Sequence, residues 1–578
     1  MEGREDVKSM LPFLPLVLRS STLSWPSAAA EEALEALSRG PEHSHVDSGE
    51  VMGVAVADIK HSLGLSSEPL APFAVEGYAL FFDELLPRND SDKWYKEVLP
   101  FLARLLLQLP SLLETHWRKA DSFFDVKRCR AMTGLRLLEQ QEPGVVVLSQ
   151  ELIAALVACS FFSLFPTHKR GSKHLPMINF DDLFAKNQPP VSVLDTNALN
   201  HDRLLSFIEI ENSRISTPFW KIRSLYKSYS EKQEHKVKCI VHYFERICSS
   251  MPKRFVFFER KVLPLEGGSS TMSYPTSDFW SKSVIPLCRV EVLSSGLIED
   301  HFAESLKVDF ANKYLGGGAL NRGCVQEEIL FMIYPELISG MLFLPAMAEN
   351  EAVKMVGAER FSSYTGYASS FQFSGDYVDK TDVDCFGRRR TRFIAIDALC
   401  SPGKRQYELQ LVLREINKAF CGFWDEPKHT KYDTLSKDNN CPSALAEDCI
   451  RDFNDNSKAP EVALDLEREL KDKDVPHSEA ATLSLSLDQE ESIGIVTGNW
   501  GCGAFGGDPQ LKSMIQWLAA SQVSEWILMH KWTVGDLWNM LEEYTSQRFK
   551  EETMLGFFLW LLPSGDDDAM TLDSMDTT

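Results

Sequence analysis

Apolar residues in the first half of this 578-residue chain recur at helical spacing. In the stretch Trp94–Leu113 they follow one another three or four positions apart, as on the buried face of a helix. They are Val98, Leu102, Leu105, Leu106 and Leu109. A similar stretch, Ser149–Phe165, begins with a serine that can cap a helix. Pro100 predicts a helix start or a kink within the first stretch. We therefore expect a helical lobe over residues 61–250, preceded by a partly ordered extension, residues 1–60.

After about residue 250 the pattern changes to short runs of β-branched and aromatic residues, separated by helical patterns and glycine-rich loops. The runs are Phe255–Phe258, Arg289–Val292, Phe393–Ile396 and Ile493–Val496. Strands alternating with helices predict an α/β domain, which we place at residues 251–545. Residues 425–491 are acidic and poor in aromatic residues, so we expect a disordered insert there. A C-terminal tail, residues 546–578, follows the domain.

The formal net charge of −23 argues against sequence-independent DNA binding, which needs a cationic surface. It does not oppose a polyanion held locally by backbone N–H groups. The N-terminus is acidic and its apolar run contains prolines, unlike a signal peptide, and no stretch approaches the roughly 20 apolar residues of a membrane span. The twelve cysteines form no CxxC pair and no metal-ligand spacing. We expect a soluble intracellular protein with free thiols and no metal or other cofactor.

Two glycine-rich segments are candidates for ligand binding. Gly316, Gly317 and Gly318 precede a helical pattern, and a glycine loop before a helix N-terminus can present N–H groups to a pyrophosphate. On the residues alone, a tight turn is an equally good interpretation. The second segment, Thr497–Asp508, lies between a β-type run and a helical pattern, which is the context of a phosphate-binding loop. Its Trp500 and Phe505 could stack on a ribose.

A pair of adjacent glutamates, Glu327 and Glu328, follows the first glycine loop. Their side chains diverge by about 100° on a helix, so they would serve different tasks. Cleavage of a glycosidic bond needs a proton donor and stabilisation of an oxocarbenium-like centre. A helix N-terminus favours the charged carboxylate and burial favours the protonated form, so burial must dominate in the donor. Spacing alone favours the alternative, a solvated pair in a first helical turn.

Considered together, the segments Gly316–Glu328 and Thr497–Asp508 resemble the signature and the diphosphate loop of the poly(ADP-ribose) glycohydrolases. Further segments that resemble the family are Leu297–Asp300, Val308–Asn312, Tyr364–Tyr367, Ile394–Ala398 and, in the helical half, Pro176–Phe184. The resemblance covers roughly residues 65–545. It implies a macrodomain-like, three-layer α/β/α fold with a mixed sheet, preceded by an α-helical accessory lobe.

The resemblance also implies roles for single residues. Glu328 would be the general acid that protonates the departing ribose oxygen and then activates water. Glu327 would hold the ribose hydroxyls, and Asp309 and Asn312 would order the same region. The other implied substrate contacts are Gln326 at the ribose, Ile298 and Glu299 at the adenine, Tyr367 over the ADP-ribose, and Gly316, Gly317, Gly318, Asn499, Gly503, Ala504 and Phe505 around the diphosphate and distal ribose.

The activity implied by the resemblance is hydrolysis of ribose–ribose O-glycosidic bonds, mainly from the polymer end, with release of ADP-ribose and without a metal. The expected partners are poly(ADP-ribose) and the proteins that carry it, with no direct DNA or membrane contact. We expect the last, protein-linked unit to be a poor substrate. We also expect the protein to be a monomer and to be located in the nucleus and the cytoplasm.

One region departs from the family pattern. After Ala520 the chain continues almost directly to Thr533–Trp538, where the family has a further strand and helix. A shortened segment, residues 521–532, would expose backbone groups and core surface. Two functions therefore stay open: an active glycohydrolase, and a non-catalytic module that binds ADP-ribose. A nucleotide-dependent oxidoreductase is disfavoured because neither loop has the dinucleotide fingerprint.

Overall fold

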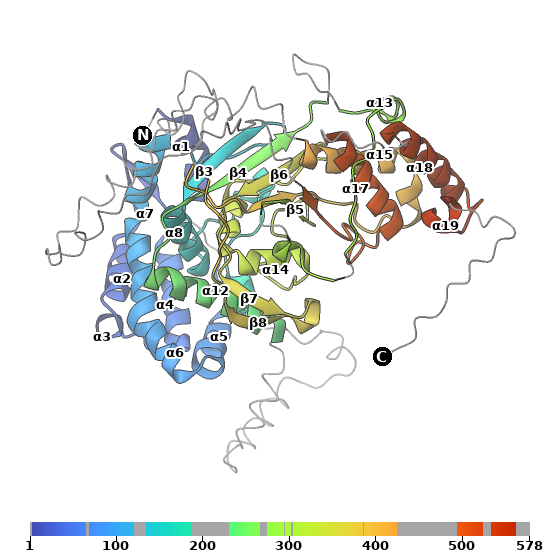
Figure 1. Ribbon diagram of the computed structural model, residues 1–578. Helices are drawn as coiled ribbons and strands as arrows, with labels where there is room; N and C mark the ends of the chain where they lie inside the picture. The colour runs from blue at the N-terminus through green and yellow to red at the C-terminus, as the bar shows by residue number, and fades with distance from the viewer. Residues whose placement is uncertain are drawn as a thin grey trace, which may run out of the picture.

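The computed structural model describes most of the helical half and of the α/β half of the chain (Figure 1). The described residues are 3–64, 69–120, 134–185, 231–265, 274–293, 295–301, 304–384, 386–424, 494–523 and 533–561. The predicted insert, residues 425–491, lies outside them, as does most of the shortened segment.

The N-terminal lobe is built mainly from helices packed around one apolar core. The helices are α1 (Glu5–Met10), α2 (Ala28–Ser38), α3 (Pro41–Ser44), α4 (Gly49–Ser62), α5 (Ala74–Ala79), α6 (Arg88–Lys93), α7 (Leu99–Ala120), α8 (Gln150–Phe161), α9 (Asp181–Phe184) and α12 (Glu231–Ser249), with a hairpin of β1 (Val17–Arg19) and β2 (Thr22–Ser24). Val7, Leu34 and Met52 are buried in this core, so residues of the segment predicted as a partly ordered extension pack against the lobe.

The longest helical stretch of the described residues, Arg88–Ala120, contains a wide π-helical turn, η3 (Trp94–Val98). The N–H of Leu99 bonds the carbonyl of Trp94, and Pro100 follows with no N–H to give. The predicted irregularity at Pro100 is therefore confirmed.

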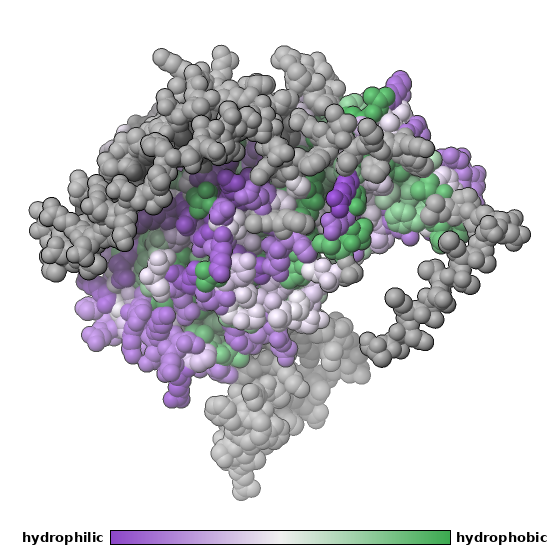
Figure 2. Space-filling model, in the orientation of Figure 1, coloured by the Kyte–Doolittle hydropathy of each residue, from purple (hydrophilic) through white to green (hydrophobic). Residues whose placement is uncertain are grey.

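By length and composition this stretch, Arg88–Ala120, is long and apolar enough to cross a membrane, contrary to the expectation that no stretch approaches a span. Half of its apolar window is buried inside the protein, with Leu102, Leu106 and Trp117 fully enclosed. The face of the lobe seen in Figure 2 is largely hydrophilic. Core packing thus accounts for the apolar composition of this helix.

A six-stranded mixed sheet forms the centre of the second half, with the order β10-β5-β9-β6-β4-β3. Its strands are β3 (Gly144–Ser149), β4 (Phe255–Val262), β5 (Leu306–Asp309), β6 (Glu351–Val356), β9 (Arg392–Ala395) and β10 (Ile495–Val496). β10, β5 and β9 are parallel to one another, and the other pairs are antiparallel. β3 belongs to the half of the chain that was predicted to be helical. It joins the sheet because the four buried residues after Gly144 pair with β4. Arg289–Val292, predicted as a strand, forms none, and Val292 is 89% exposed.

Side chains alternate between two cores on the two faces of the sheet, as strand geometry requires. In β9, Phe393 and Ala395 point into the core shared with the helical lobe, whereas Ile394 points into the other. The second core is covered by α13 (Ser277–Ser281), α15 (Leu409–Phe423), α17 (Pro509–Val523), α18 (Val534–Phe549) and α19 (Phe557–Leu561). The predicted three-layer fold with a mixed sheet and a helical lobe is confirmed.

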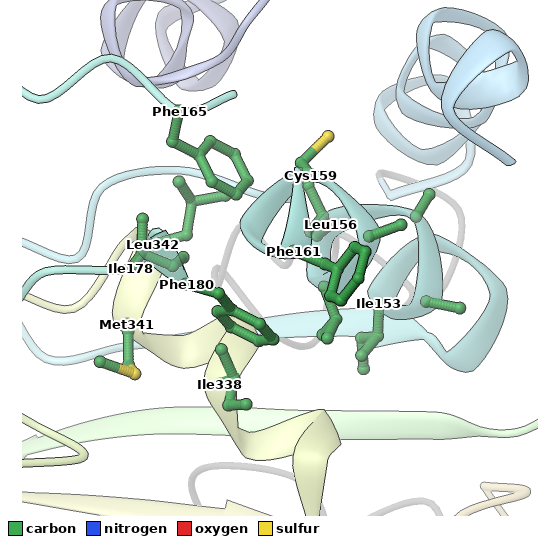
Figure 3. Packing of buried hydrophobic residues seen from close by; sticks show 14 of the residues in the cluster. Ile153, Leu156, Cys159, Phe161, Phe165, Ile178, Phe180, Ile338, Met341 and Leu342 are labelled. Atoms are coloured by element: carbon green, nitrogen blue, oxygen red, sulfur yellow. The ribbon is translucent and has the colours of Figure 1, made fainter. Parts of the chain in front are cut away.

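The helical lobe and the first face of the sheet are joined by continuous packing. Figure 3 shows side chains of α8 and Phe180 facing Ile338 and Leu342 of η7 (Pro335–Leu342). Gln150 adds a hydrogen bond of 2.8 Å to Glu336, and both side chains are buried. The lobe therefore has a fixed position beside the residues that follow β5.

Candidate active site

The glutamate pair lies at the carboxyl end of β5, in the first turn of α14 (Gln326–Ile333). Gln326 fixes this helix to the strand end: its Oε1 accepts the N–H of Phe310 at 2.8 Å and its Nε2 donates to the carbonyl of Val308 at 3.2 Å. Helix and strand are thus connected both by the glycine loop and by this side chain.

The two glutamates have different backbone partners. Glu327 accepts the N–H groups of Asn312 and Gly316 at 2.8 and 2.7 Å. Glu328 accepts those of Gly318 at 2.9 Å and Val325 at 2.7 Å. Their side chains belong to residues that are only 2% and 7% exposed, so the alternative of a solvated pair is wrong. Every carboxylate oxygen of the pair is held by a main-chain donor, in an asymmetric arrangement.

The first glycine loop serves the glutamates rather than an open anion site. The N–H groups of Gly316 and Gly318 point to carboxylates, and that of Gly317 bonds the carbonyl of Tyr314. The expectation that these donors face a diphosphate is therefore wrong. Gly317 has φ +49°, and a Cβ there would lie 2.6 Å from Glu327 Oε2 and 2.7 Å from Glu328 Oε1. Only glycine lets the backbone pass so close to both carboxylates.

Asp309 adds a third carboxyl group. It is fully buried, and neither of its carboxylate oxygens has a hydrogen-bond partner among the described residues. Burial raises its pKa well above the ordinary value, and the charge of Glu328 raises it further. The pKa of Glu327 is also raised, first by burial and then by Asp309 and Glu328, although its two main-chain donors oppose the rise. This clustering favours retention of a proton by Asp309 and Glu327 as a pair.

Lys236 of α12 closes the glycine loop from the helical lobe. Its ammonium donates to the carbonyls of Gly323 at 2.6 Å, Asn321 at 2.8 Å and Gly318 at 3.3 Å. Burial lowers its pKa to about 8, while the nearby Glu328 opposes the decrease. Sequence reasoning missed this residue. The sequence feature that could have indicated its role is the position of this lysine on the apolar face of the helix, one turn before Ile240.

Tyr367 reaches the same site from the turn between β7 (Ser362–Thr365) and β8 (Gln372–Asp376). It is 53% exposed. Burial of the rest raises the pKa of Tyr367, a hydrogen bond with the backbone of Gln326 lowers it, and the charge of Glu328 raises it. The predicted residue Tyr367 is therefore placed beside α14.

The same hairpin rests on α12. Asp376 of β8 accepts from His242 at 3.0 Å and pairs with Arg246, and the N–H of Phe373 donates to His235 at 3.2 Å. The helical lobe thus positions both the glycine loop and the hairpin.

The predicted adenine contacts lie on η6 (Ile298–Asp300). The hydroxyl of Tyr364 donates to the carboxylate of Glu299, which holds that side chain in place. Asp300 pairs with Arg360 at 2.5 Å. Ile298 lies near the second glycine loop, since a Cβ on Gly498 would be 3.9 Å from its Cδ1.

The second loop, residues 497–508, connects β10 to α17. Asn499, Gly503 and Ala504 are exposed and Phe505 is half-buried, so these four predicted residues are accessible to a ligand. Trp500 is completely buried and donates its indole N–H to the carbonyl of Ile396 at 2.9 Å. The expectation that Trp500 stacks on a ribose is therefore wrong.

Asn312 differs in part from its predicted role. Its Oδ1 accepts the N–H of Tyr314 at 3.0 Å, so the side chain also shapes the turn before the glycine loop. Within the described residues, no group of three His, Cys, Asp or Glu side chains is placed to hold a metal ion.

Comparison with known proteins identifies the family. The model of the poly(ADP-ribose) glycohydrolase macro domain fold matches residues 277–536, and that of the helical domain matches 86–201 and 199–260. Poly(ADP-ribose) glycohydrolase 1 of Arabidopsis thaliana is 49% identical over 98% of both chains, and the probable poly(ADP-ribose) glycohydrolase 2 of the same plant is 45% identical over 98% of this chain and 99% of its own length. Poly(ADP-ribose) glycohydrolase 1 of Caenorhabditis elegans is 30% identical over 57% of this chain and 35% of its own.

The first of these alignments spans 594 positions although this chain has 578 residues, so the plant relative contains residues with no counterpart here. The two family models together still match most of the chain. The chain therefore belongs to the poly(ADP-ribose) glycohydrolases, a family of glycosidases.

Proposed function

We propose that the protein hydrolyses the ribose–ribose O-glycosidic bonds of poly(ADP-ribose) and releases ADP-ribose. The observation that carries this proposal is the buried, asymmetric glutamate pair, with each carboxylate held by two main-chain N–H groups and Asp309 close by. A fixed carboxyl group that can donate a proton, beside carboxylates that can stabilise positive charge, is what glycosidic cleavage requires.

In this proposal Glu328 is the proton donor, because it is the more exposed member of the pair, at 7% against 2%. Its proton moves to the departing ribose oxygen as the bond from that oxygen to the anomeric carbon breaks. Glu327 holds the ribose hydroxyls at the scissile linkage, and its carboxylate stabilises the positive charge that develops on the sugar. Glu328 then takes a proton from water, whose oxygen forms the new bond to the anomeric carbon.

We assign the diphosphate to the second loop alone, since the N–H donors of the first loop are used by the glutamates. Asn499, Gly503, Ala504 and Phe505 would surround it. The adenine would contact Ile298 and Glu299 on η6, and Tyr367 would cover the ADP-ribose from above. Gln326 and Asn312 would complete the ribose site.

The direct test is incubation of the purified full-length chain with purified poly(ADP-ribose), with the product identified by mass spectrometry. We expect ADP-ribose from the wild type. A non-catalytic ADP-ribose-binding module is the second candidate, because the plant relative has residues that this chain lacks. That candidate replaces the proposal if the wild type retains polymer on a filter but releases no ADP-ribose.

We also propose a monomer located in nucleus and cytoplasm. Light scattering at micromolar concentration and imaging of a fluorescent fusion test these two points, and a stable dimer or exclusion from the nucleus would overturn them.

A further inference from the structure

A buried lysine lies behind the second loop. Lys512, in the first turn of α17, is 2% exposed and folds back under residues 497–508. Its ammonium pairs with the carboxylate of Glu415 on α15 and lies 4.2 Å from the ring centroid of Trp500. Because the Trp500 indole is itself bonded to the carbonyl of Ile396, the lysine, the indole and the strand end form one rigid unit.

The backbone of the loop passes directly over this ammonium. Gly501 has φ +74°, and a Cβ there would lie 3.2 Å from the Nζ of Lys512 and 2.5 Å from the Cβ of Ala398. A Cβ on Gly507 would lie 3.1 Å from the Cε of Lys512. The two glycines therefore bring the main chain as close to the cation as packing allows.

The charges around Lys512 do not balance. Arg414 contacts Asp397 at 2.7 Å and Glu415 at 2.6 Å, and Lys418 contacts Asp397 at 2.7 Å. These four residues and Lys512 are all buried. Three cations thus face two carboxylates, which leaves one excess positive charge beneath the loop.

A third carboxylate, Asp508, is not among the charges that act on the pKa of Lys512, so it does not cancel this excess. Asp508, at the end of the loop, accepts the hydroxyl of Tyr407 at 2.6 Å and the N–H of Gln510 at 2.8 Å. Burial and, after it, the charge of Arg414 lower the pKa of Lys512 to about 7, while Asp397 opposes the decrease. An excess cation under an exposed loop is costly in the free protein, and an anion on the outer face of the loop would offset that cost.

We infer that Lys512 is a positioning residue for the diphosphate of ADP-ribose: its charge, acting through the backbone of the second loop, attracts the diphosphate without touching it. This inference rests on the proposed function, in which that loop holds the diphosphate. A charge acting across several ångströms of low-dielectric protein changes the affinity for a diphosphate about tenfold.

The test compares Lys512→Met with Lys512→Arg, using ADP-ribose and adenosine as ligands in calorimetry at pH 6.5. Lys512→Met should bind ADP-ribose about tenfold more weakly and adenosine as tightly as the wild type does. On polymer it should raise KM and leave kcat unchanged, and Lys512→Arg should restore both. An equal loss for the two ligands, or no loss, overturns the inference.

A second measurement covers the case in which Lys512→Met does not fold. Lys512 is charged below a pKa of about 7, so the wild type should lose affinity for ADP-ribose as pH rises from 6 to 8.5, whereas Lys512→Arg should lose less. Identical pH dependence in the two proteins overturns the inference. Failure of the proposed function looks different, because the wild type would then bind ADP-ribose with this pH dependence but release none from polymer.

Discussion

Replacing Lys236 by methionine should separate catalysis from stability. The ammonium holds three carbonyls of the glycine loop, whose N–H groups in turn hold the glutamate pair. Methionine keeps the apolar stem of the side chain in its enclosed position, so that packing on α12 is preserved and only the charge and its hydrogen bonds are lost. The three carbonyls lie on a partly exposed loop and can accept water instead.

The expected effect on stability is small for a reason that can be calculated. Burial holds the pKa of Lys236 at about 8 instead of 10.5, which corresponds to roughly 3 kcal/mol of unfavourable free energy for the charged group. The two short hydrogen bonds of this charged donor contribute a comparable amount, about 1.5 kcal/mol each, and the third, at 3.3 Å, contributes little. Because the substitution removes both terms, the free energy of unfolding should change by no more than about 1 kcal/mol.

The expected effect on catalysis is large, because the loop that orients Glu328 loses its anchor. A misplacement of about 1 Å at a reacting group costs about a hundredfold in rate, so we predict a decrease in kcat of that order. Urea unfolding and ADP-ribose release measure the two quantities. Lys238→Met is the matched control, since Lys238 on the same helix is partly exposed and pairs with Glu234 at 2.6 Å. An unchanged kcat, or a loss of 3 kcal/mol or more in stability, refutes the reasoning.

The pH dependence of stability gives an independent check on Lys236. Its pKa is lower in the folded protein than in the unfolded chain, so the unfolded chain binds the proton more tightly between the two values. The contribution of this group to stability therefore rises as pH increases from about 8 to 10.5. Lys236→Met should lack that rise, and the Lys238 control should keep it.

Three further predictions concern the carboxylates and their supports. Gly317→Ala should reduce kcat at least about a hundredfold in a folded protein, because its Cβ would meet both carboxylates of the glutamate pair; near wild-type turnover contradicts this. Tyr364→Phe should raise KM about tenfold with kcat unchanged, because Glu299 loses its hydroxyl donor; an unchanged KM counts against the adenine assignment. Asp309→Asn removes a charge that raises the pKa of Glu327, so the acidic limb of the pH–rate profile should move to lower pH; a move to higher pH would refute this.

The sequence predicted correctly those helices whose pattern and caps lie within one short segment of the chain. The helical spacing in Trp94–Leu113 corresponds to α7 and its preceding turn, and Ser149 caps α8 by accepting the N–H of Leu152 at 3.3 Å. The neighbouring strand β3 was missed, because a buried apolar run directly before a capped helix can equally be an earlier helical turn. Arg289–Val292 has the alternation of a strand, but no strand in the described part of the chain pairs with it.

The parts of the site that could not be predicted depend on contacts between distant segments. Lys236 meets Gly323 across 87 positions of sequence, and Tyr364 meets Glu299 across 65. The direction of the N–H groups in the first glycine loop was mistaken, because glycine permits both orientations and only the buried Glu327 selects one. The sequence thus indicated which residue types the site contains, whereas their contact partners could be identified only from the folded structure.

The central claim is that Glu328 transfers the proton that cleaves the polymer. The most direct measurement is single-turnover release of ADP-ribose by the wild type and by Glu328→Gln, with polymer affinity determined on the same preparations and with Glu142→Gln, at an exposed turn, as control. We predict a loss of about a thousandfold or more in rate for Glu328→Gln at unchanged polymer affinity, and no loss for the control. Release by Glu328→Gln within tenfold of the wild-type rate would contradict the account.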